Sequence, residues 1–360
     1  MTRLLPAPAA AALSPAAALA SGRWVKWIGG ASNQDLPAIE DLAGIYTLAG
    51  AHCLDLAADA AVVAAARRGI AWAIQRGAAK PWLMVSLSDG ADPHFRKAWF
   101  DPSRCPPACP RPCARACPAL AIPAGGAVVR ERCYGCGRCL PACPLGLIEE
   151  RHSLLAASDV APLLAELRPD AVELHTRIGR GEAFAERLQQ VRDARLPLRR
   201  LAVSCGLEGA PEGDATALAR ELWQRFGLLR AAALRPLWQL DGRPMSGDVG
   251  AGTAQAAVRL LRAVGPLAPP GPLQLAGGTN HHTLALVDRL PGAAPPVAGV
   301  AFGSVARQQL QSLLLEAQSQ GRRLLDAPDL LEPALARARA LVEPWLGRRS
   351  PHPQPAPRRD

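Results

Sequence analysis

The feature that most constrains this chain is the clustering of its cysteines. Ten cysteines occur in 360 residues, and eight of them fall in one short segment, in two groups of four. The earlier group has gaps of three residues and ends in C-P: Cys105, Cys109, Cys113 and Cys117. The later group has the spacing C-x2-C-x2-C-x3-C-P: Cys133, Cys136, Cys139 and Cys143. This distribution argues against a set of disulfides.

The spacing of the later group is that of the cluster ligands in bacterial ferredoxins. Two-residue gaps let three thiolates face one cubane, whereas the fourth cysteine lies too far along and ligates the neighbouring cluster. One predicted centre therefore consists of Cys105, Cys109, Cys113 and Cys143. The other consists of Cys117, Cys133, Cys136 and Cys139. The sequence thus predicts two [4Fe–4S] clusters.

Alternatives remain open for this segment. The widened gaps of the earlier group are compatible with a full [4Fe–4S] cluster, a three-iron cluster or a more labile one. Zinc sites also use C-x2-C pairs, but they need two separate pairs rather than triplets followed by C-P. Gly135 and Gly137 suit a backbone that passes close to sulfur. Cys53 and Cys205 stand alone and are interpreted as buried, inert thiols.

The charge of the chain bears on its partners. The net charge is +10, and arginine supplies nearly all of the cations. These arginines form no basic run and no nucleic-acid motif, which argues against nucleic-acid binding. Arginines outnumber acidic residues within the cysteine segment, so this surface could attract an acidic ferredoxin or flavodoxin. Beyond the leader, no uncharged stretch is long enough to span a membrane, and a cytoplasmic protein is expected.

Outside the cysteine segment, short apolar runs alternate with longer amphipathic stretches. Strands are expected at 24–28, 52–57, 82–87, 171–175, 201–205, 237–241, 273–276 and 298–302. Helices are expected at 37–48, 60–74, 154–167, 182–194, 214–229, 253–264, 282–290 and 305–318. Eight strands and eight helices favour a (βα)8 barrel with the cysteine segment inserted into it. An open doubly wound sheet is the alternative.

This pattern predicts five segments. They are a disordered Ala/Pro leader at 1–22, the first part of the barrel at 23–98, a two-cluster ferredoxin-like insert at 99–150, the rest of the barrel at 151–346, and a disordered Pro/Arg tail at 347–360. The leader does not have the continuous apolar helix that a signal peptide needs, because prolines interrupt it.

Glycine-rich loops follow the last two expected strands. They contain Gly277, Gly278, Thr279, Gly303 and Ser304. Barrels commonly bind phosphate with these two loops and a following helix N-terminus, so FMN or another phosphate-bearing ligand is a possible occupant.

Further polar residues should surround the barrel mouth. They are Ser32, Asn33, Asp55, Asp59, Ser86, Ser88, His175, Gln239, Asp241, Arg243 and the rest of the loop 241–248. His281 and His282 are expected to be solvated. No nucleophile–base pair or metal-ligand motif stands out among these residues, so no catalytic residue is predicted.

Four segments together resemble the light-dependent period protein family of cyanobacteria, the iron–sulfur proteins called LdpA. They are WVKWIGGASNQDLPAIEDLAGIYTLAGAHCLDLAAD, CYGCGRCLPACPLGLI, DGRPMSGD and LAGGTNHHT, and the resemblance extends over 23–318. It implies a cytoplasmic, redox-responsive protein that passes information about light and redox state to the circadian clock. The implied partners are clock-complex proteins of the Kai type and their histidine kinases. The family's cluster ligands carry over onto the eight clustered cysteines.

Three functions follow as hypotheses. In the first, a redox sensor, the state of the clusters alters a docking surface. In the second, an oxidoreductase, clusters pass electrons to a flavin in the barrel. In the third, an electron carrier, the barrel is a structural support.

Overall fold

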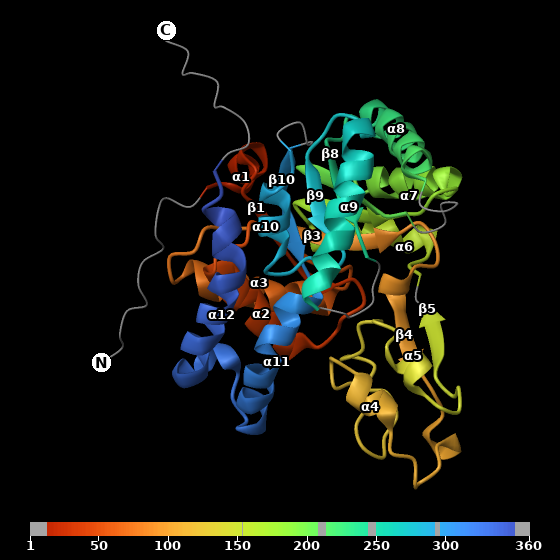
Figure 1. The fold of residues 1–360 in the computed structure, drawn as a ribbon, viewed down its shortest axis with the longest axis vertical. Helices are drawn as coiled ribbons and strands as arrows, with labels where there is room; N and C mark the ends of the chain where they lie inside the picture. The colour runs from red at the N-terminus through yellow and green to blue at the C-terminus, as the bar shows by residue number, and fades with distance from the viewer. Residues whose placement is uncertain (1–12, 153, 208–213, 244–249, 292–295, 350–360) are drawn as a thin grey trace.

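A closed barrel of eight parallel strands forms the body of the protein in the computed structural model, which describes residues 13–152, 154–207, 214–243, 250–291 and 296–349 (Figure 1). The strands are β1 (Trp24–Gly30), β2 (Cys53–Ala57), β3 (Trp82–Ser88), β6 (Ala171–His175), β7 (Arg200–Cys205), β8 (Pro236–Asp241), β9 (Leu273–Ala276) and β10 (Val297–Phe302). Each barrel strand pairs with the next barrel strand along the chain. The pairing of β1 with β10, where Trp24 lies beside Gly299, closes the barrel. The predicted barrel is confirmed, and the open-sheet alternative is wrong.

A helix follows each barrel strand and packs outside it. These helices are α2 (Leu36–Leu48), α3 (Ala60–Ile74), α6 (Ala157–Leu167), α7 (Gly181–Asp193), α8 (Ala215–Ala231), α9 (Ala254–Val264), α10 (Thr283–Asp288) and α11 (Ser304–Ser319). Aspartates cap several of them: Asp59, for example, accepts hydrogen bonds from the backbone N–H groups of Ala61 and Val62. No described helix has the length and apolar character that a membrane crossing requires.

Among the described residues outside the cysteine segment, two helices were not expected. Helix α1 (Pro15–Ser21) buries Ala18 and Leu19 against apolar side chains from the N-terminal ends of the strands. The disorder predicted for 1–22 is therefore wrong from residue 13 onward, because the barrel floor offers an apolar surface to this Ala-rich segment. Residues 1–12 lie outside the described part of the chain. Helix α12 (Pro328–Leu346) packs on α11 and α2 despite two internal prolines.

The C-terminal tail is ordered at its start. Arg348 donates hydrogen bonds to the carbonyl oxygens of Gly22 and Val297, and its Nε lies 3.6 Å from Asp288 Oδ1. The disorder predicted for 347–360 is therefore wrong for 347–349, while 350–360 lie outside the described residues.

The cysteine segment enters and leaves through a two-stranded antiparallel ribbon. Strand β4 (Arg96–Trp99) pairs with β5 (Glu149–His152). Between them lie two short helices, α4 (Pro112–Ala116) and α5 (Cys139–Ala142). The ribbon begins at 96 and ends at 152, slightly outside the predicted limits of 99 and 150. Because the insert follows β3, it lies at the end of the barrel where the strands have their C-termini, and α1 lies at the opposite end (Figure 1).

Substitution of Gly69 tests the packing of α3 against α2. A Cβ atom at Gly69 would collide with the Glu40 carbonyl oxygen and lie 2.8 Å from Gly44 N. We expect Gly69→Ala to lower the free energy of unfolding by about 1–3 kcal/mol. Gly227→Ala is the matched control, because nothing lies within 4 Å of its Cβ in α8, and alanine there should stabilise the helix by about 0.5–1 kcal/mol. Urea unfolding measures both, and equal effects would contradict the close approach.

Candidate functional site

The insert gathers its eight clustered cysteines into two crossed groups. In the first group, Cys105 interacts electrostatically with Cys109 and Cys143, and Cys113 interacts with Cys105 and Cys143. In the second group, Cys139 interacts with Cys136, Cys133 and Cys117. Each group thus contains three cysteines from one stretch of four in the sequence and one cysteine from the other stretch. The two sets are those that the spacing predicts, and metal ligation by them stays a prediction.

Backbone amides donate hydrogen bonds to sulfur atoms of both groups. The N–H of Ala121 donates to Cys117 Sγ over 3.3 Å, and the N–H of Leu147 donates to Cys143 Sγ over 3.4 Å. In both pairs the donating residue comes four positions after the cysteine, and a proline directly follows that cysteine. Ala98 N donates to Cys133 Sγ over 3.4 Å. Such donors stabilise thiolate charge, as they do around iron–sulfur clusters.

The second group converges on one apolar cavity. The four thiols of this group line it together with Ala98, Ala119, Ala121, Ile122, Val128 and the stretch 134–137. Burial raises the pKa of Cys136, and it raises the pKa of Cys139 to about 12. The thiols must therefore release protons when they bind a metal. Four soft ligands around an apolar space suit an iron–sulfur cluster.

The first group is the more accessible of the two. Only Cys113 is buried, against Phe100 and Ile148, and the other three members are half-buried. In the second group both Cys133 and Cys139 are buried.

Two glycines between the cysteines of the second group have left-handed backbone conformations and pack against β4. Gly135 and Gly137 have φ values of +78° and +75°. A Cβ atom at Gly135 would collide with the carbonyl oxygen of Arg96, and one at Gly137 would collide with the Arg96 guanidinium. The Arg96 side chain in turn donates from Nε to the Gly135 carbonyl oxygen over 2.8 Å. These contacts fix the cysteine loop on the ribbon.

Direct hydrogen bonds join the insert to the barrel near the second group. Lys97 Nζ donates to Gln34 Oε1 over 2.9 Å and to the Arg130 carbonyl oxygen over 2.7 Å. Gln34 N donates to the Glu131 carbonyl oxygen over 3.1 Å. The buried guanidinium of Arg307 lies 5.4 Å from the centre of the Tyr134 ring.

A buried ionic network crosses the barrel below this contact. Lys26 is fully buried, and its Nζ donates to Asp55 Oδ2 over 2.7 Å and to Glu173. Gln239 Nε2 donates to Glu173 Oε1 over 2.7 Å, and Ser86 Oγ donates to Asp55 Oδ1 over 2.7 Å. Burial raises the pKa of Asp55 to about 6, although the charge of Lys26 opposes the rise. One cation is thus shared by two carboxylates.

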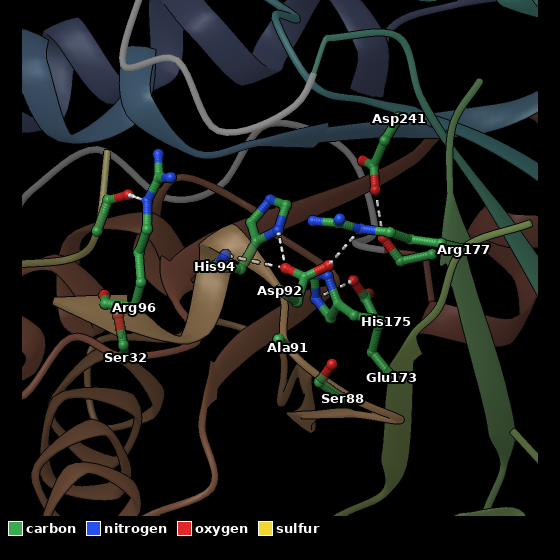
Figure 2. Close-up of polar contacts among 12 residues, drawn as sticks. Ser32, Ser88, Ala91, Asp92, His94, Arg96, Glu173, His175, Arg177 and Asp241 are labelled. Atoms are coloured by element: carbon green, nitrogen blue, oxygen red, sulfur yellow. Dashed lines mark hydrogen bonds and ion pairs between the residues drawn. The ribbon is translucent and has the colours of Figure 1, made fainter. Parts of the chain in front are cut away.

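Above the network lies a cluster of ionisable side chains at the barrel mouth (Figure 2). His175 Nε2 lies 3.1 Å from Glu173 Oε1. Burial alone would lower the pKa of His175, but the hydrogen bond and charge of Glu173, together with the charges of Asp92 and Asp241, raise it to about 9. His94 Nδ1 lies 2.7 Å from Asp92 Oδ1. Burial opposes ionisation of Asp92, but its bonds and charge interactions with His94 and His175 hold the pKa of Asp92 well below its usual range.

A cavity opens from this cluster toward the insert. Its lining includes many of the predicted residues: Ser86, His175, Gln239, Asp241, Arg243, Gly277, Gly278, Thr279, Gly303 and Ser304. Tyr134 of the second cysteine group lines the same cavity. The Thr279 hydroxyl donates to the Ala301 carbonyl oxygen, so it helps to build the loop. Phosphate binding by these loops stays a prediction.

The other predicted mouth residues lie elsewhere. Ser32, Asp59 and Ser88 line a separate cavity, and the Asn33 side chain donates to the Gly29 carbonyl oxygen. Residues 244–249 of the predicted polar loop lie outside the described part of the chain. His281 and His282 are exposed, and Cys53 and Cys205 are buried, as the sequence predicts.

Sequence reasoning missed Lys26, Asp92, His94, Glu173 and Arg307. Glu173 and His175 are two residues apart on β6, so strand alternation puts both on one face. That periodicity could have identified Glu173, whereas Asp92 and His94 stand in a turn with no periodic signal.

Comparison with known proteins gives consistent matches. Residues 163–344 match the family described as Light dependent period A C-terminal domain, and 105–154 match the LdpA Fe-S cluster-binding domain. Light dependent period A of Synechococcus elongatus is 48% identical over 336 residues, which cover 92% of this chain and 93% of that protein.

Solved structures are more distant. Tryptophan synthase of Mycobacterium tuberculosis is 13% identical with a TM-score of 0.43, covering 91% of this chain and 94% of that chain. A 2,3-dimethylmalate lyase is 12% identical with a TM-score of 0.37, covering 90% of this chain and 96% of that chain.

Removal of the Lys26 charge tests the buried network. Lys26→Met would leave two buried carboxylates without their cation, so we expect the free energy of unfolding to fall by about 3–5 kcal/mol. Adding Asp55→Asn should recover part of this loss. Lys80→Met, at an exposed lysine, should change stability by less than about 0.5 kcal/mol. Urea unfolding followed by circular dichroism measures the three variants; equal midpoints for the Lys26 and Lys80 variants would refute the role of Lys26.

Proposed function

This chain belongs to the light dependent period A family, and we propose that it is an iron–sulfur redox sensor that reports light and redox state to the circadian clock. The observation that carries the proposal is the crossed convergence of eight cysteines on a two-stranded support at the barrel mouth. The name of the Synechococcus relative supports the link to light-dependent timing.

Two groups of ligands would hold the clusters. One is Cys105, Cys109, Cys113 and Cys143, and the other is Cys117, Cys133, Cys136 and Cys139. When bound, clusters of this kind supply one-electron transfer at potentials of roughly −700 to +450 mV. The amides of Ala98, Ala121 and Leu147 would stabilise the thiolates. The greater exposure of the first group supports a more labile centre there.

Lys97 connects the second group to the barrel. Its ammonium group interacts electrostatically with Cys133 and bridges Gln34 of the barrel to the Arg130 carbonyl oxygen of the insert. A change of charge around Cys133 would therefore alter the attraction on a cation that fastens the insert. Local electrostatic changes of this kind can bias a two-state interface.

Exposed arginines on the insert supply a docking surface for acidic partners. Arg104 and Arg115 are exposed beside the first group, and Arg130 is exposed beside the second. Positive surfaces speed association with acidic proteins more than they strengthen it. The partners we propose are Kai-type clock proteins and their histidine kinases; an acidic ferredoxin or flavodoxin would suit the same surface.

One observation favours an oxidoreductase as the second candidate. Tyr134, which directly follows Cys133, lines the barrel-mouth cavity together with the glycine loops. A flavin phosphate held by Gly277, Gly278, Thr279, Gly303 and Ser304 would place a redox cofactor beside the second cysteine group.

Iron and acid-labile sulfide per chain test the clusters. On protein purified without oxygen we expect about eight of each, which would establish two cubanes. Cys136→Ala and Cys109→Ala should each lower both contents, because each removes one ligand from a different group. Cys205→Ala is the control, because this buried thiol belongs to neither group. About four iron atoms would mean that one group alone assembles a cluster, and zinc in place of iron would refute the proposal.

Redox-dependent capture distinguishes the sensor from the oxidoreductase. Purified Kai-type proteins and histidine kinases are presented to the anaerobic holoprotein, either oxidised or reduced with dithionite. A sensor should show several-fold different capture between the two states, and Arg104→Glu with Arg115→Glu should slow association. Arg192→Glu, on the barrel helix α7, is the control. Equal capture in both states, together with tightly bound flavin in the purified protein, would favour the oxidoreductase instead.

A further inference from the structure

We propose that Asp92, His94 and His175 form a binding site for a divalent transition-metal ion at the barrel mouth, separate from the cysteine groups. Each residue offers one ligand atom, and these atoms all lie within 4.8 Å of one another. In the described part of the chain, no other group of three histidine, cysteine or acidic side chains brings its ligand atoms this close. Two imidazoles and one carboxylate are a ligand set that divalent iron, manganese, cobalt and zinc accept.

The fold holds each of these side chains in place. Asp92 caps the short 3-10 turn Pro93–Phe95, with Oδ1 accepting from His94 N over 2.9 Å. The same oxygen lies 2.7 Å from His94 Nδ1, a separation that two ligands of one metal ion can also adopt. The His94 and His175 rings lie with their centres 4.6 Å apart. The three side chains therefore meet without a change in the backbone.

The Glu173 carboxylate lies behind His175 and orients its ring. His175 Nε2 lies 3.1 Å from Glu173 Oε1, which also accepts from Gln239. Histidines that bind metals usually donate their other ring N–H to a carboxylate, which fixes the tautomer and raises the basicity of the ligand. With Nε2 held by Glu173, His175 Nδ1 is left to face a metal ion. The Lys26 network below fixes Glu173 in turn.

The surroundings are suited to a cation with further ligands. Asp241 lines the same small cavity as Asp92, His94 and His175, and its carboxylate adds negative charge there. Arg177 brings a positive charge that opposes cation binding, because its Nε lies 3.8 Å from Asp92 Oδ2. His94, His175 and Asp241 also line the larger cavity beneath Tyr134. A metal ion bound here would therefore lie beside a cavity that could hold a small oxygen-donor molecule.

Manganese is the probe that separates this site from the cysteines, because Mn²⁺ prefers nitrogen and oxygen ligands to thiolates. The holoprotein with assembled clusters is titrated with Mn²⁺, and the free ion is measured by electron paramagnetic resonance. We expect one bound Mn²⁺ per chain, and at least tenfold weaker binding in His94→Ala and in Asp92→Asn. Glu173→Gln should weaken binding about 10- to 100-fold through His175.

His281→Ala and His282→Ala are the matched controls, because both histidines are exposed on a mouth loop and neither belongs to the group. Both should bind Mn²⁺ like the unaltered protein. Iron and sulfide contents equal to those of the unaltered protein show that each variant is folded around its clusters. Half-buried His94 is the position where loss of folding is least expected. No Mn²⁺ binding up to millimolar concentration, or equal binding by His94→Ala, would overturn the site.

Discussion

The interior of this barrel is organised by a single buried ammonium group. Lys26 of β1 contacts Asp55 of β2 and Glu173 of β6, and so ties together strands on different sides of the barrel. Gln239 and Gln274 extend the polar layer to β8 and β9, where Gln274 also accepts from Trp24 Nε1 over 2.6 Å. Because burial of unpaired charge is so costly, loss of any one of these contacts should destabilise the closed barrel. The layer that stabilises the fold also sets the charge beneath the mouth.

The sequence was most informative where the signal is local. Alternating apolar runs located all eight barrel strands, and cysteine spacing located the two thiol groups, because both patterns depend on near neighbours in the chain. Helix α1 was hidden by its composition, since alanine and proline also fill disordered leaders. Helix α12 was hidden by Pro333 and Pro344, which usually break helices.

The barrel-mouth cluster was hidden for a different reason. Asp92 and His94 belong to the turn before the insert, whereas Glu173 and His175 follow it on β6. More than 75 residues separate the two pairs in the sequence, and only closure of the barrel brings them together. Likewise, nothing in the cysteine spacing indicates that Tyr134 turns toward the barrel and lies beneath Arg307. Such contacts depend on where the insert is placed, which spacing within the insert does not determine.

The position of α1 determines how molecules can enter the barrel. Ala18 and Leu19 fill the end where the strands begin, in one apolar layer with Trp24, Leu237 and Ala298. The barrel is therefore filled at the end where its strands begin, and the cysteine insert lies across part of the opposite end. A small molecule that reaches the ionic layer through the main cavity at the barrel mouth passes beside Tyr134. Its rate of exchange with solvent would thus depend on the strength of the hydrogen bond between Lys97 and Gln34, which holds the insert against the barrel mouth.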